Sequence, residues 1–312
     1  RLVKLNYKVR AFVLYNSFNS LGWLDTLDEK IKKKIDFITG DIRDEHSIKN
    51  SIKGCDVVIN LAALIGIPYS YKSPRSYYDT NVIGTLNILQ SSKDLNVKKI
   101  IHTSTSEVYG TPLYTPIDEK HPINAQSPYA SSKVAADQLA ISFFKSYNLP
   151  VTVIRPFNTY GPRQSARAVI PTIITQILSG KNFVKLGNIE TTRDLTYIDD
   201  TISGFINSIN KKNNGEVINL GTGFDYSIKY LVNTISKILS VNVKIILDNK
   251  RVRPKKSEVL KLQSKNLKAK KLLNWKPKYT NKKGLILGLK KTIDWFANPE
   301  NSKNYKPNNY NI

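Results

Sequence analysis

The sequence predicts an α/β fold in which helices cover a largely parallel β-sheet. Three observations lead to this prediction: short apolar runs rich in β-branched residues recur through the first half, amphipathic segments separate several of them, and no internal repeat is present. Strands that alternate with helices build a parallel sheet, because each helix carries the chain back to the end of the sheet where it started. The 312 residues, 40% of them hydrophobic, can bury a large core.

The predicted elements follow in order along the first half of the chain. Residues 1–12 read as the end of a helix that leads into a strand. The apolar runs predict five strands, and two longer amphipathic runs predict helices between them. The strands are expected within residues 8–16, 35–41, 55–63, 97–106 and 149–158, and the helices within residues 47–53 and 80–96.

The alternation loosens after Asn158, which predicts a second, smaller region. We expect one region over residues 1–158 and the other over residues 159–312, with the chain returning to the first region near 195–222. The stretch "GTGFD", which starts at Gly221, matches a glycine-rich phosphate loop only in part. We interpret it as a turn before a helix that Ser227 caps.

The start of the chain departs from the pattern of a doubly wound sheet. Such a fold opens with a strand and a glycine-rich turn that holds a dinucleotide pyrophosphate at a helix N-terminus. Here the first residue is Arg1, and neither that strand nor that turn is found. In the strand order 3-2-1-4-5-6 the first strand lies in the middle of the sheet, so its absence would leave unpaired backbone on both neighbours. We therefore expect the chain to be a fragment of a longer product.

Composition excludes several classes of function. The net charge of +24 comes from lysines scattered over loops and helix surfaces, without a basic helix interleaved with aromatic residues, so we expect no nucleic-acid partner. The most apolar stretch, residues 57–67, is shorter than the ~20 residues of a membrane span, and no secretory signal is visible. The single Cys55 cannot form an internal disulfide. We expect a cytoplasmic protein without a membrane partner.

The stretch "YASSK" supplies the first chemical motif. Tyr129 and Lys133 are four residues apart, which places them on one face of a helix. An ammonium beside a phenol stabilises the phenolate, so we expect Lys133 to lower the pKa of Tyr129 and let it act as a base. Taken alone, the pair also fits a solvated helix face. Its position, about twenty residues after the end of a buried strand, favours a functional role.

The stretch "TSTSEVYG" supplies the second motif. Ligands bind outside the carboxyl ends of the strands in a parallel sheet, and Thr105, Ser106 and Glu107 directly follow the apolar run "KKIIH". We therefore expect these three side chains to face a cofactor or substrate. For Ser104 a turn or cap role remains open.

Five motifs in the same order resemble one enzyme family. "NLAAL", "TSTSEVYG", "YASSK", "RPFNTYGPR" and "TRDLTYIDD" together are similar to the extended short-chain dehydrogenase/reductase family, the nucleotide-sugar epimerases and dehydratases. The resemblance runs from residue 1 to about residue 300. Within the family, residues 11–25, residues 155–180 and the terminal "YKPNNYNI" look most like the NAD-dependent 4,6-dehydratases of legionaminic-acid-type sugar pathways.

The resemblance implies a role for each residue of the two motifs. Tyr129 would take the proton of the C4 hydroxyl while NAD⁺ takes the hydride, and Lys133 would hold the phenolate and the nicotinamide ribose. Thr105 would hydrogen-bond the C4 oxygen. Glu107 would remove the C5 proton, and Ser106 or Glu107 would help hydroxide leave C6. Glucose-type dehydratases carry an Asp where this chain has Ser106, so the identity of the proton donor stays open.

The resemblance also implies where cofactor and substrate bind. It makes residues 1–158 a Rossmann-type dinucleotide-binding domain and residues 159–312 mainly a substrate-binding domain. NAD is the expected cofactor and NADP the alternative, because residues 14–17 supply neither the acid that grips a ribose hydroxyl nor an arginine for a 2'-phosphate. No metal is expected, since no metal-ligand spacing exists and His102 and His121 read as structural. The expected cofactor contacts are Asp41, Ile42, Leu61, Ala62, Ala63, Tyr129 and Lys133, and the expected substrate contacts are Asn158, Arg163, Arg193, Asn219 and Arg253.

Three hypotheses about function follow. The first is a 4,6-dehydratase that acts on a UDP- or GDP-linked N-acetylglucosamine and gives a 4-keto-6-deoxy sugar. The second is a nucleotide-glucuronate decarboxylase or a nucleotide-sugar C4-epimerase of the same fold, because the decarboxylases share "TSEVYG". The third is a non-catalytic binder of nucleotides or nucleic acid. Family habit predicts a homodimer formed through two helices, one of which carries "YASSK".

Overall fold

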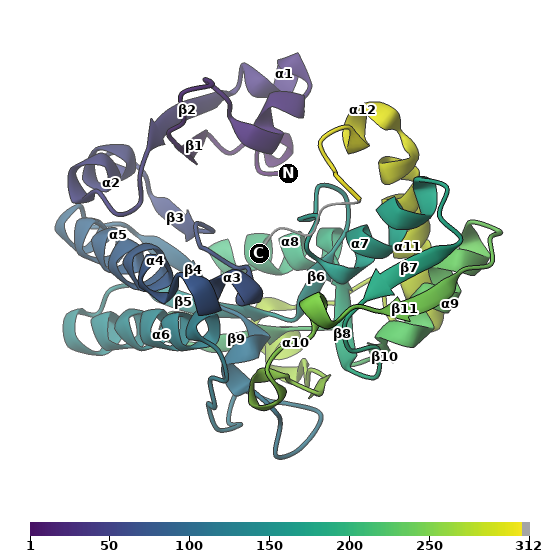
Figure 1. The fold of residues 1–312 in the computed structure, drawn as a ribbon. Helices are drawn as coiled ribbons and strands as arrows, with labels where there is room; N and C mark the ends of the chain where they lie inside the picture. Colours follow the sequence, from purple (N-terminus) through teal and green to yellow (C-terminus); the bar gives the residue numbers. More distant parts are fainter. Residues whose placement is uncertain (308–312) are drawn as a thin grey trace.

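The computed structural model describes residues 1–307, and a parallel sheet of four strands lies at its centre (Figure 1). The strand order is β3 (Val57–Asn60), β4 (Lys99–Thr103), β5 (Val151–Pro156) and β9 (Val217–Leu220). Every neighbouring pair in this sheet is parallel. The predicted α/β fold with a parallel sheet is therefore confirmed.

A second parallel pair of strands lies beyond β3. It consists of β1 (Val9–Leu14) and β2 (Ile35–Gly40), drawn in purple in Figure 1. Among residues 1–307, no strand pairs with the free edge of β1 or with the free edge of β3. The two sheets therefore present unpaired edges.

Helices cover both faces of the four-stranded sheet. One face carries α2 (Glu45–Ile52), α5 (Gly84–Asp94) and α6 (Pro128–Tyr147), and the other carries α8 (Ile198–Ile209) and α10 (Leu267–Leu273). Because helices cover both faces, β4 and β5 are buried along nearly their whole length. The first layer packs through Ile48, Leu89, Phe143, Val151 and Val153, and the second through Ile154, Phe205, Ile218, Leu273 and Trp275.

Local sequence signals fix the ends of α6, the helix that carries "YASSK". The hydroxyl of Ser127 accepts a hydrogen bond from the backbone N–H of Ala130, and Pro128 occupies the first turn, where no N–H is needed. Asn148 ends the helix in the left-handed conformation. These signals leave Tyr129 in the first turn, beside the carboxyl ends of the strands.

The helix predicted over residues 80–96 begins with an irregular turn. Residues Asp79–Ile83 form a π-helical turn, and regular α-helix follows over Gly84–Asp94. The turn directs the amide of Asn81 inward, where it accepts from the N–H of Leu64 and donates to the hydroxyl of Ser132. Single π turns of this kind are frequent near functional sites.

The second half of the chain builds its own small sheets. The strand β8 (Thr192–Tyr197) pairs with β6 (Asn158–Tyr160), β10 (Asp225–Ser227) and β12 (Lys261–Leu262). The chain then passes through α8 to β9 of the main sheet before it returns to β10. The remaining elements of this half are α7 (Val169–Leu178), β7 (Phe183–Leu186), α9 (Ile228–Ile238), β11 (Lys244–Leu247), α11 (Asn281–Ala297) and α12 (Pro299–Ser302).

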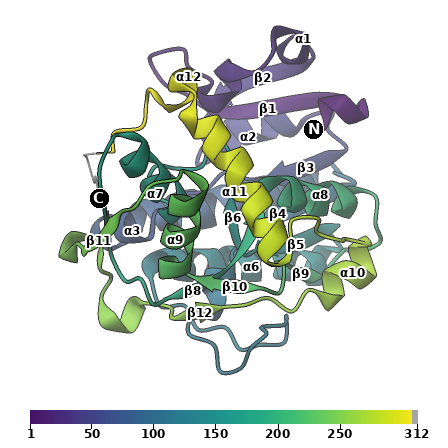
Figure 2. The same cartoon turned by 90° about the vertical axis from the view of Figure 1, so that its right-hand side faces the viewer.

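One sequence expectation about this half concerns the segment that follows β9. Ser227 caps α9, since its hydroxyl accepts from the N–H of Tyr230, and this confirms the interpretation of "GTGFD" as a turn before a capped helix. Figure 2 shows α11 lying across the molecule, where it contacts α7 and α9. Over residues 1–307, no helix combines the length and the apolar character that a membrane crossing requires.

An aromatic clasp joins the segment after β1 to α11 and to the segment after α12. We use this name for Trp23, Trp295 and Tyr305 together with Arg163. Trp23 lies in the short helix after β1, and its ring centroid is 5.5 Å from Trp295 and 6.0 Å from Tyr305. The guanidinium of Arg163 lies 5.7 Å from the Trp295 ring centroid and donates to the hydroxyl of Thr26.

Candidate active site

The carboxyl end of β4 continues into a buried 3-10 turn, Ser106–Tyr109. Thr105 caps this turn, because its hydroxyl accepts from the backbone N–H of Glu107 at 3.2 Å. Gly110 ends it at φ 61°, where an added Cβ would lie 2.1 Å from the carbonyl oxygen of Asn124. The polar residues after β4 are therefore buried at the carboxyl ends of the parallel strands and do not form a solvated loop.

Tyr129 lies against this turn. Its side chain is only 7% exposed, its ring centroid is 6.3 Å from that of Tyr77 in α4 (Pro74–Tyr78), and its hydroxyl interacts with Thr105. Burial raises the pKa of Tyr129, and Glu107 raises it further, while the hydrogen bond with Thr105 lowers it. Tyr129, Thr105 and Glu107 therefore form one group, which brings residues of the two motifs together.

The predicted effect of Lys133 on Tyr129 is wrong for this state of the protein. The ammonium of Lys133 donates to the carbonyl oxygen of Thr103 at 2.5 Å, and burial lowers the pKa of Lys133 to about 8. A buried ammonium needs an acceptor, and the strand end supplies one. The pKa of Tyr129 is consequently raised by burial and not lowered as the one-face argument predicted.

Charges of alternating sign lead away from Glu107 into the second half of the chain. Arg193 in β8 is buried, which lowers its pKa, while Glu107 and Glu258 act in the opposite direction. One carboxylate oxygen of Glu258 lies 3.6 Å from Arg193 and 3.7 Å from Arg253. Glu107, Arg193, Glu258 and Arg253 thus follow one another with signs that alternate, and we call them the charge row.

Two members of the predicted substrate set belong to this row. Arg193 and Arg253 share Glu258, a residue that sequence reasoning missed. Its place in "RPKKSE", five residues after Arg253, was the available signal. The Nη1 atom of Arg253, which lies 3.7 Å from Glu258, is buried and has no hydrogen-bond partner within the chain.

The other three predicted substrate contacts have different surroundings. Arg163 belongs to the aromatic clasp. Asn219 is fully buried, and its amide accepts from the hydroxyl of Tyr109 and donates to the carbonyl of Ile117, so both halves of the side chain are used internally. Asn158 keeps a buried side-chain oxygen without a partner.

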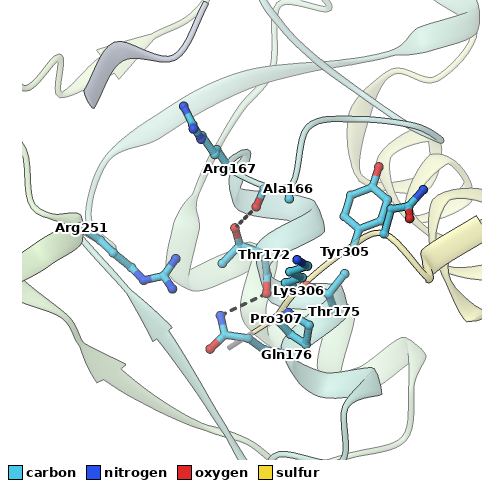
Figure 3. A pocket seen from close by; sticks show the side chains of 10 residues that line it. Ala166, Arg167, Thr172, Thr175, Gln176, Arg251, Tyr305, Lys306 and Pro307 are labelled. Atoms are coloured by element: carbon cyan, nitrogen blue, oxygen red, sulfur yellow. Dashed lines mark hydrogen bonds between the residues drawn. The ribbon is translucent and has the colours of Figure 1, made fainter. Parts of the chain in front are cut away.

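A basic cavity of about 190 Å³ lies in the second half of the chain (Figure 3). Thr172 and Gln176 project from α7, and Figure 3 shows Arg167 and Arg251 on the side away from Tyr305. The Nη1 atom of Arg167 reaches to within 3.1 Å of the position that a Cβ on Gly66 would take, and its charge lowers the pKa of Tyr77, which burial raises. The cavity is lined by Ala166, Arg167, Thr172, Thr175, Gln176, Arg251, Asn304, Tyr305, Lys306 and Pro307.

Arg167 therefore links the basic cavity to the neighbourhood of Tyr129. Gly66 precedes α3 (Ile67–Lys72), its carbonyl accepts from the hydroxyl of Tyr77, and Tyr77 packs on Tyr129. Sequence reasoning missed Arg167, because "SARAVIP" resembles an ordinary start of a helix and the neighbour of Arg167 lies a hundred residues earlier.

The predicted cofactor contacts follow the carboxyl ends of β2 and β3. The carboxylate of Asp41 is held by Arg43, whose hydrogen bond lowers the pKa of Asp41. Ile42 is buried, and it packs so closely against Gly84 that an added Cβ there would meet it at 2.9 Å. After β3, Leu61 and Ala62 are exposed and Ala63 is half-buried.

The residues at this edge fit a dinucleotide cofactor. Large apolar side chains are exposed just where the strands end: Leu14 is 64% exposed, Tyr15 69%, Leu61 67% and Ile65 62%. Exposed apolar surface beside a buried tyrosine and lysine suits the flat rings and ribose of a nucleotide. Within residues 1–307, no cluster of three or more His, Cys, Asp or Glu residues could hold a metal ion.

Comparisons with known proteins agree with this geometry. Residues 1–286 match the family model described as GDP-mannose 4,6 dehydratase. The chain is 32% identical over 273 residues to a putative UDP-glucose 4-epimerase of Methanocaldococcus jannaschii, and the alignment covers 86% of each protein. It is 32% identical over 294 residues to the dTDP-D-glucose 4,6-dehydratase of Homo sapiens, which covers 92% of this chain and 81% of that protein. The solved structure of a dTDP-glucose 4,6-dehydratase from Bacillus anthracis, in complex with NAD, superimposes with a TM-score of 0.84 at 28% identity and covers 98% of this chain and 94% of that one.

Proposed function

Since the chain belongs to the GDP-mannose 4,6-dehydratase family of extended short-chain dehydrogenases/reductases, we propose that its reaction is the removal of water across C5 and C6 of a nucleotide-linked hexose. The chain is an NAD-dependent enzyme of nucleotide-sugar metabolism. The dehydratase reaction itself, the hexose and the role of each residue are our proposal. The observation that carries it is Glu107, a buried carboxylate beside Tyr129.

Bound NAD⁺ supplies an acceptor for a hydride that is later returned. Tyr129, Lys133 and the exposed apolar residues after β3 would hold it. Tyr129 takes the proton of the C4 hydroxyl, and Thr105 hydrogen-bonds the same oxygen. Lys133 must leave the carbonyl of Thr103 to stabilise the phenolate, because burial otherwise keeps the pKa of Tyr129 raised.

Glu107 performs the step that distinguishes a dehydratase from a simple epimerase. A ketone at C4 acidifies the C5 proton, and a carboxylate placed beside Tyr129 can remove it. Hydroxide then leaves C6 with a proton from Ser106 or from Glu107. The hydride taken from C4 would return to C6, and a proton from solvent would add to C5, which gives the 4-keto-6-deoxy sugar. An epimerase that only inverts C4 has no evident need for this base.

The charge row supports dehydration over decarboxylation. A glucuronate substrate would bring a C6 carboxylate toward Glu107, with which the cation of Arg193 interacts. That cation already faces Glu107 on one side and Glu258 on the other. A third carboxylate would be repelled by both acids, whereas a neutral hydroxymethyl group would not.

The basic cavity supports a nucleotide sugar as substrate. Arg167, Arg251 and Lys306 give it positive charge, and Tyr305 gives it an aromatic ring. Guanidinium groups match the geometry of a diphosphate. We propose that this second half of the chain binds the nucleotide, that the sugar points toward Tyr129, and that residues 1–158 and 159–312 act as cofactor-binding and substrate-binding domains.

Two finer assignments complete the proposal. The resemblance of residues 11–25 and 155–180 to legionaminic-type dehydratases favours UDP- or GDP-linked N-acetylglucosamine as the substrate. We also propose a cytoplasmic homodimer formed through α5 and α6. The exposed Ile83 and Tyr147, at the start of α5 and the end of α6, would lie at that interface.

A product assay in heavy water tests the proposed reaction. The enzyme with NAD is incubated with UDP- and GDP-linked N-acetylglucosamine and with the matching glucuronates, and products are analysed by mass and NMR. Dehydration removes the mass of water and places one solvent deuterium at C5. An isomer of unchanged mass would identify an epimerase, and release of CO₂ from a glucuronate would identify a decarboxylase; either result would overturn the proposal.

A further inference from the structure

A buried ion pair lies directly behind the candidate active site. Asp137 follows Lys133 by one turn of α6, and its carboxylate is 0% exposed. One of its oxygens accepts from both Nε and Nη2 of Arg155, at 3.0 and 2.9 Å. Arg155 lies in β5 and is itself only 3% exposed. The pair thus ties the helix of "YASSK" to the centre of the sheet.

The pair also holds the start of the strand-end turn. The same oxygen of Asp137 accepts from the hydroxyl of Ser104 at 2.8 Å. Ser104 stands between Thr103, whose carbonyl binds Lys133, and Thr105, which caps the turn and interacts with Tyr129. The hydroxyl of Ser104 therefore attaches the residues after β4 to α6, the helix that carries Tyr129 and Lys133.

A second arm of the pair holds the end of the same turn. Nη1 of Arg155 donates to the hydroxyl of Tyr109 at 3.0 Å, and that hydroxyl donates to the side-chain oxygen of Asn219 at 2.8 Å. Tyr109 is the last residue of the turn, and it is fully buried. The turn is therefore fixed at both ends by one ion pair, and Glu107 lies between the two fixed points.

Titratable groups from three elements face Asp137. His102 in β4 lies 3.5 Å from its second oxygen, Arg155 lies in β5, and Lys133 lies on α6. Burial opposes ionisation of Asp137, but hydrogen bonds and charges from His102 and Arg155 lower its pKa. An ion pair this deep often gives little net stability compared with apolar residues of the same volume, so stability alone does not account for it.

We propose that Asp137 and Arg155 are positioning residues that hold the Glu107 turn in register with Tyr129 and Lys133, through Ser104 at one end and Tyr109 at the other. Neither residue touches the substrate. Catalysis by a tyrosine and a carboxylate from two different elements requires a fixed spacing between them, and displacement by about 1 Å costs about a hundredfold in rate. The proposal rests on Glu107 acting with Tyr129, as in the proposed function.

The test removes each of the two hydrogen bonds that join the ion pair to the turn, which we call its arms: Ser104 to Asp137, and Arg155 to Tyr109. The ion pair itself stays in place, because loss of Asp137 can prevent folding. Ser104→Ala removes the first arm, and Tyr109→Phe removes the second. Ser208→Ala and Tyr160→Phe are matched controls, because both residues are buried and each hydroxyl makes a hydrogen bond elsewhere in the protein. The hydroxyl of Ser208 accepts from the amide of Asn213, and the hydroxyl of Tyr160 donates to the carbonyl of Leu285. Ser208 lies on α8, on the opposite face of the sheet from α6.

Two measurements are made on the full chain. Hydrogen exchange of residues 105–109 without ligand should rise about tenfold in Ser104→Ala and Tyr109→Phe and remain unchanged in both controls. With NAD, kcat should fall about tenfold in the same two variants while the KM for the nucleotide sugar stays within twofold. Equal exchange and equal kcat in arm variants and controls would overturn the proposal. The exchange measurement needs no substrate, so its result stands even if the product assay identifies another reaction.

Discussion

The ammonium of Lys133 donates a hydrogen bond to the carbonyl oxygen of Thr103, at 2.5 Å, so this lysine is attached to the strand end and not to Tyr129. Burial lowers the pKa of Lys133 from 10.5 to about 8. Lys133 therefore titrates within a pH range that experiments can reach.

This shift predicts how stability depends on pH. The folded protein binds fewer protons at Lys133 than the unfolded chain between pH 8 and about 10, so the contribution of Lys133 to stability rises with pH over that window. We expect Lys133→Met to be more stable than the parent at pH 7, by up to about 3 kcal/mol, and the difference to vanish near pH 10. Chemical denaturation at a series of pH values measures it. A constant difference would contradict the lowered pKa.

Removal of the Tyr129 hydroxyl should stop turnover without unfolding the protein. Tyr129→Phe leaves the ring packed on Tyr77 and removes the group that we propose takes the proton of the C4 hydroxyl, so we expect kcat to fall by about 10²–10⁴. Tyr77→Phe is the matched control, since it removes only a hydrogen bond to the carbonyl of Gly66. Steady-state rates and melting curves measure both, and an active Tyr129→Phe enzyme would rule out the assigned role.

Glu107→Gln should separate binding from elimination. The amide has nearly the same shape but cannot take a proton, so we expect product formation to fall by about 10²–10⁴ and deuterium to stop entering C5. Calorimetry should show that nucleotide-sugar affinity is retained. Ser106→Ala in the same assay identifies the proton donor at C6: full activity there would assign that step to Glu107.

Glu258→Gln should strengthen the binding of nucleoside diphosphates. The carboxylate lies 3.6 and 3.7 Å from Arg193 and Arg253, beyond good hydrogen-bond distance, so it neutralises these cations more than it aligns them. We expect the affinity for UDP to rise severalfold in this variant, as titration calorimetry would show. Weaker binding would mean that Glu258 serves mainly to hold the two arginines in place.

Substitution of two arginines should give opposite results. Arg163→Ala breaks the cation–π contact with Trp295, so we expect a loss of about 0.5–1 kcal/mol in stability and little change in the KM for the nucleotide sugar. Arg193→Ala should raise that KM strongly. Thermal unfolding and steady-state kinetics distinguish the two. A large KM effect of Arg163→Ala would place it at the substrate after all.

The strands, α6 and the strand-end turn could be predicted because their signals are local. Apolar runs mark β4, and Ser127 with Pro128 marks the start of α6. The carboxyl ends of parallel strands share one edge, which brings Glu107 to Tyr129 without any knowledge of side-chain contacts.

What the sequence could not predict depends on partners far along the chain. The raised pKa of Tyr129 depends on burial, to which Tyr77 contributes. Arg163 packs on the ring of Trp295, more than a hundred residues later in the chain. The side-chain oxygen of Asn219 accepts a hydrogen bond from Tyr109, which comes from another element. A motif gives the residue type at a position, but it does not say which side chain from another element will form a hydrogen bond with that residue.

The charge row has a consequence for how fast the enzyme meets its substrate. Its two acids and two cations sum to zero, so these four residues exert little pull on a distant anion, despite the net charge of +24 of the whole chain. Attraction over long distances must come from the scattered surface lysines and from the basic cavity. Added salt should therefore slow the encounter of enzyme and nucleotide sugar, while it leaves the rate of the chemical step inside the buried site almost untouched.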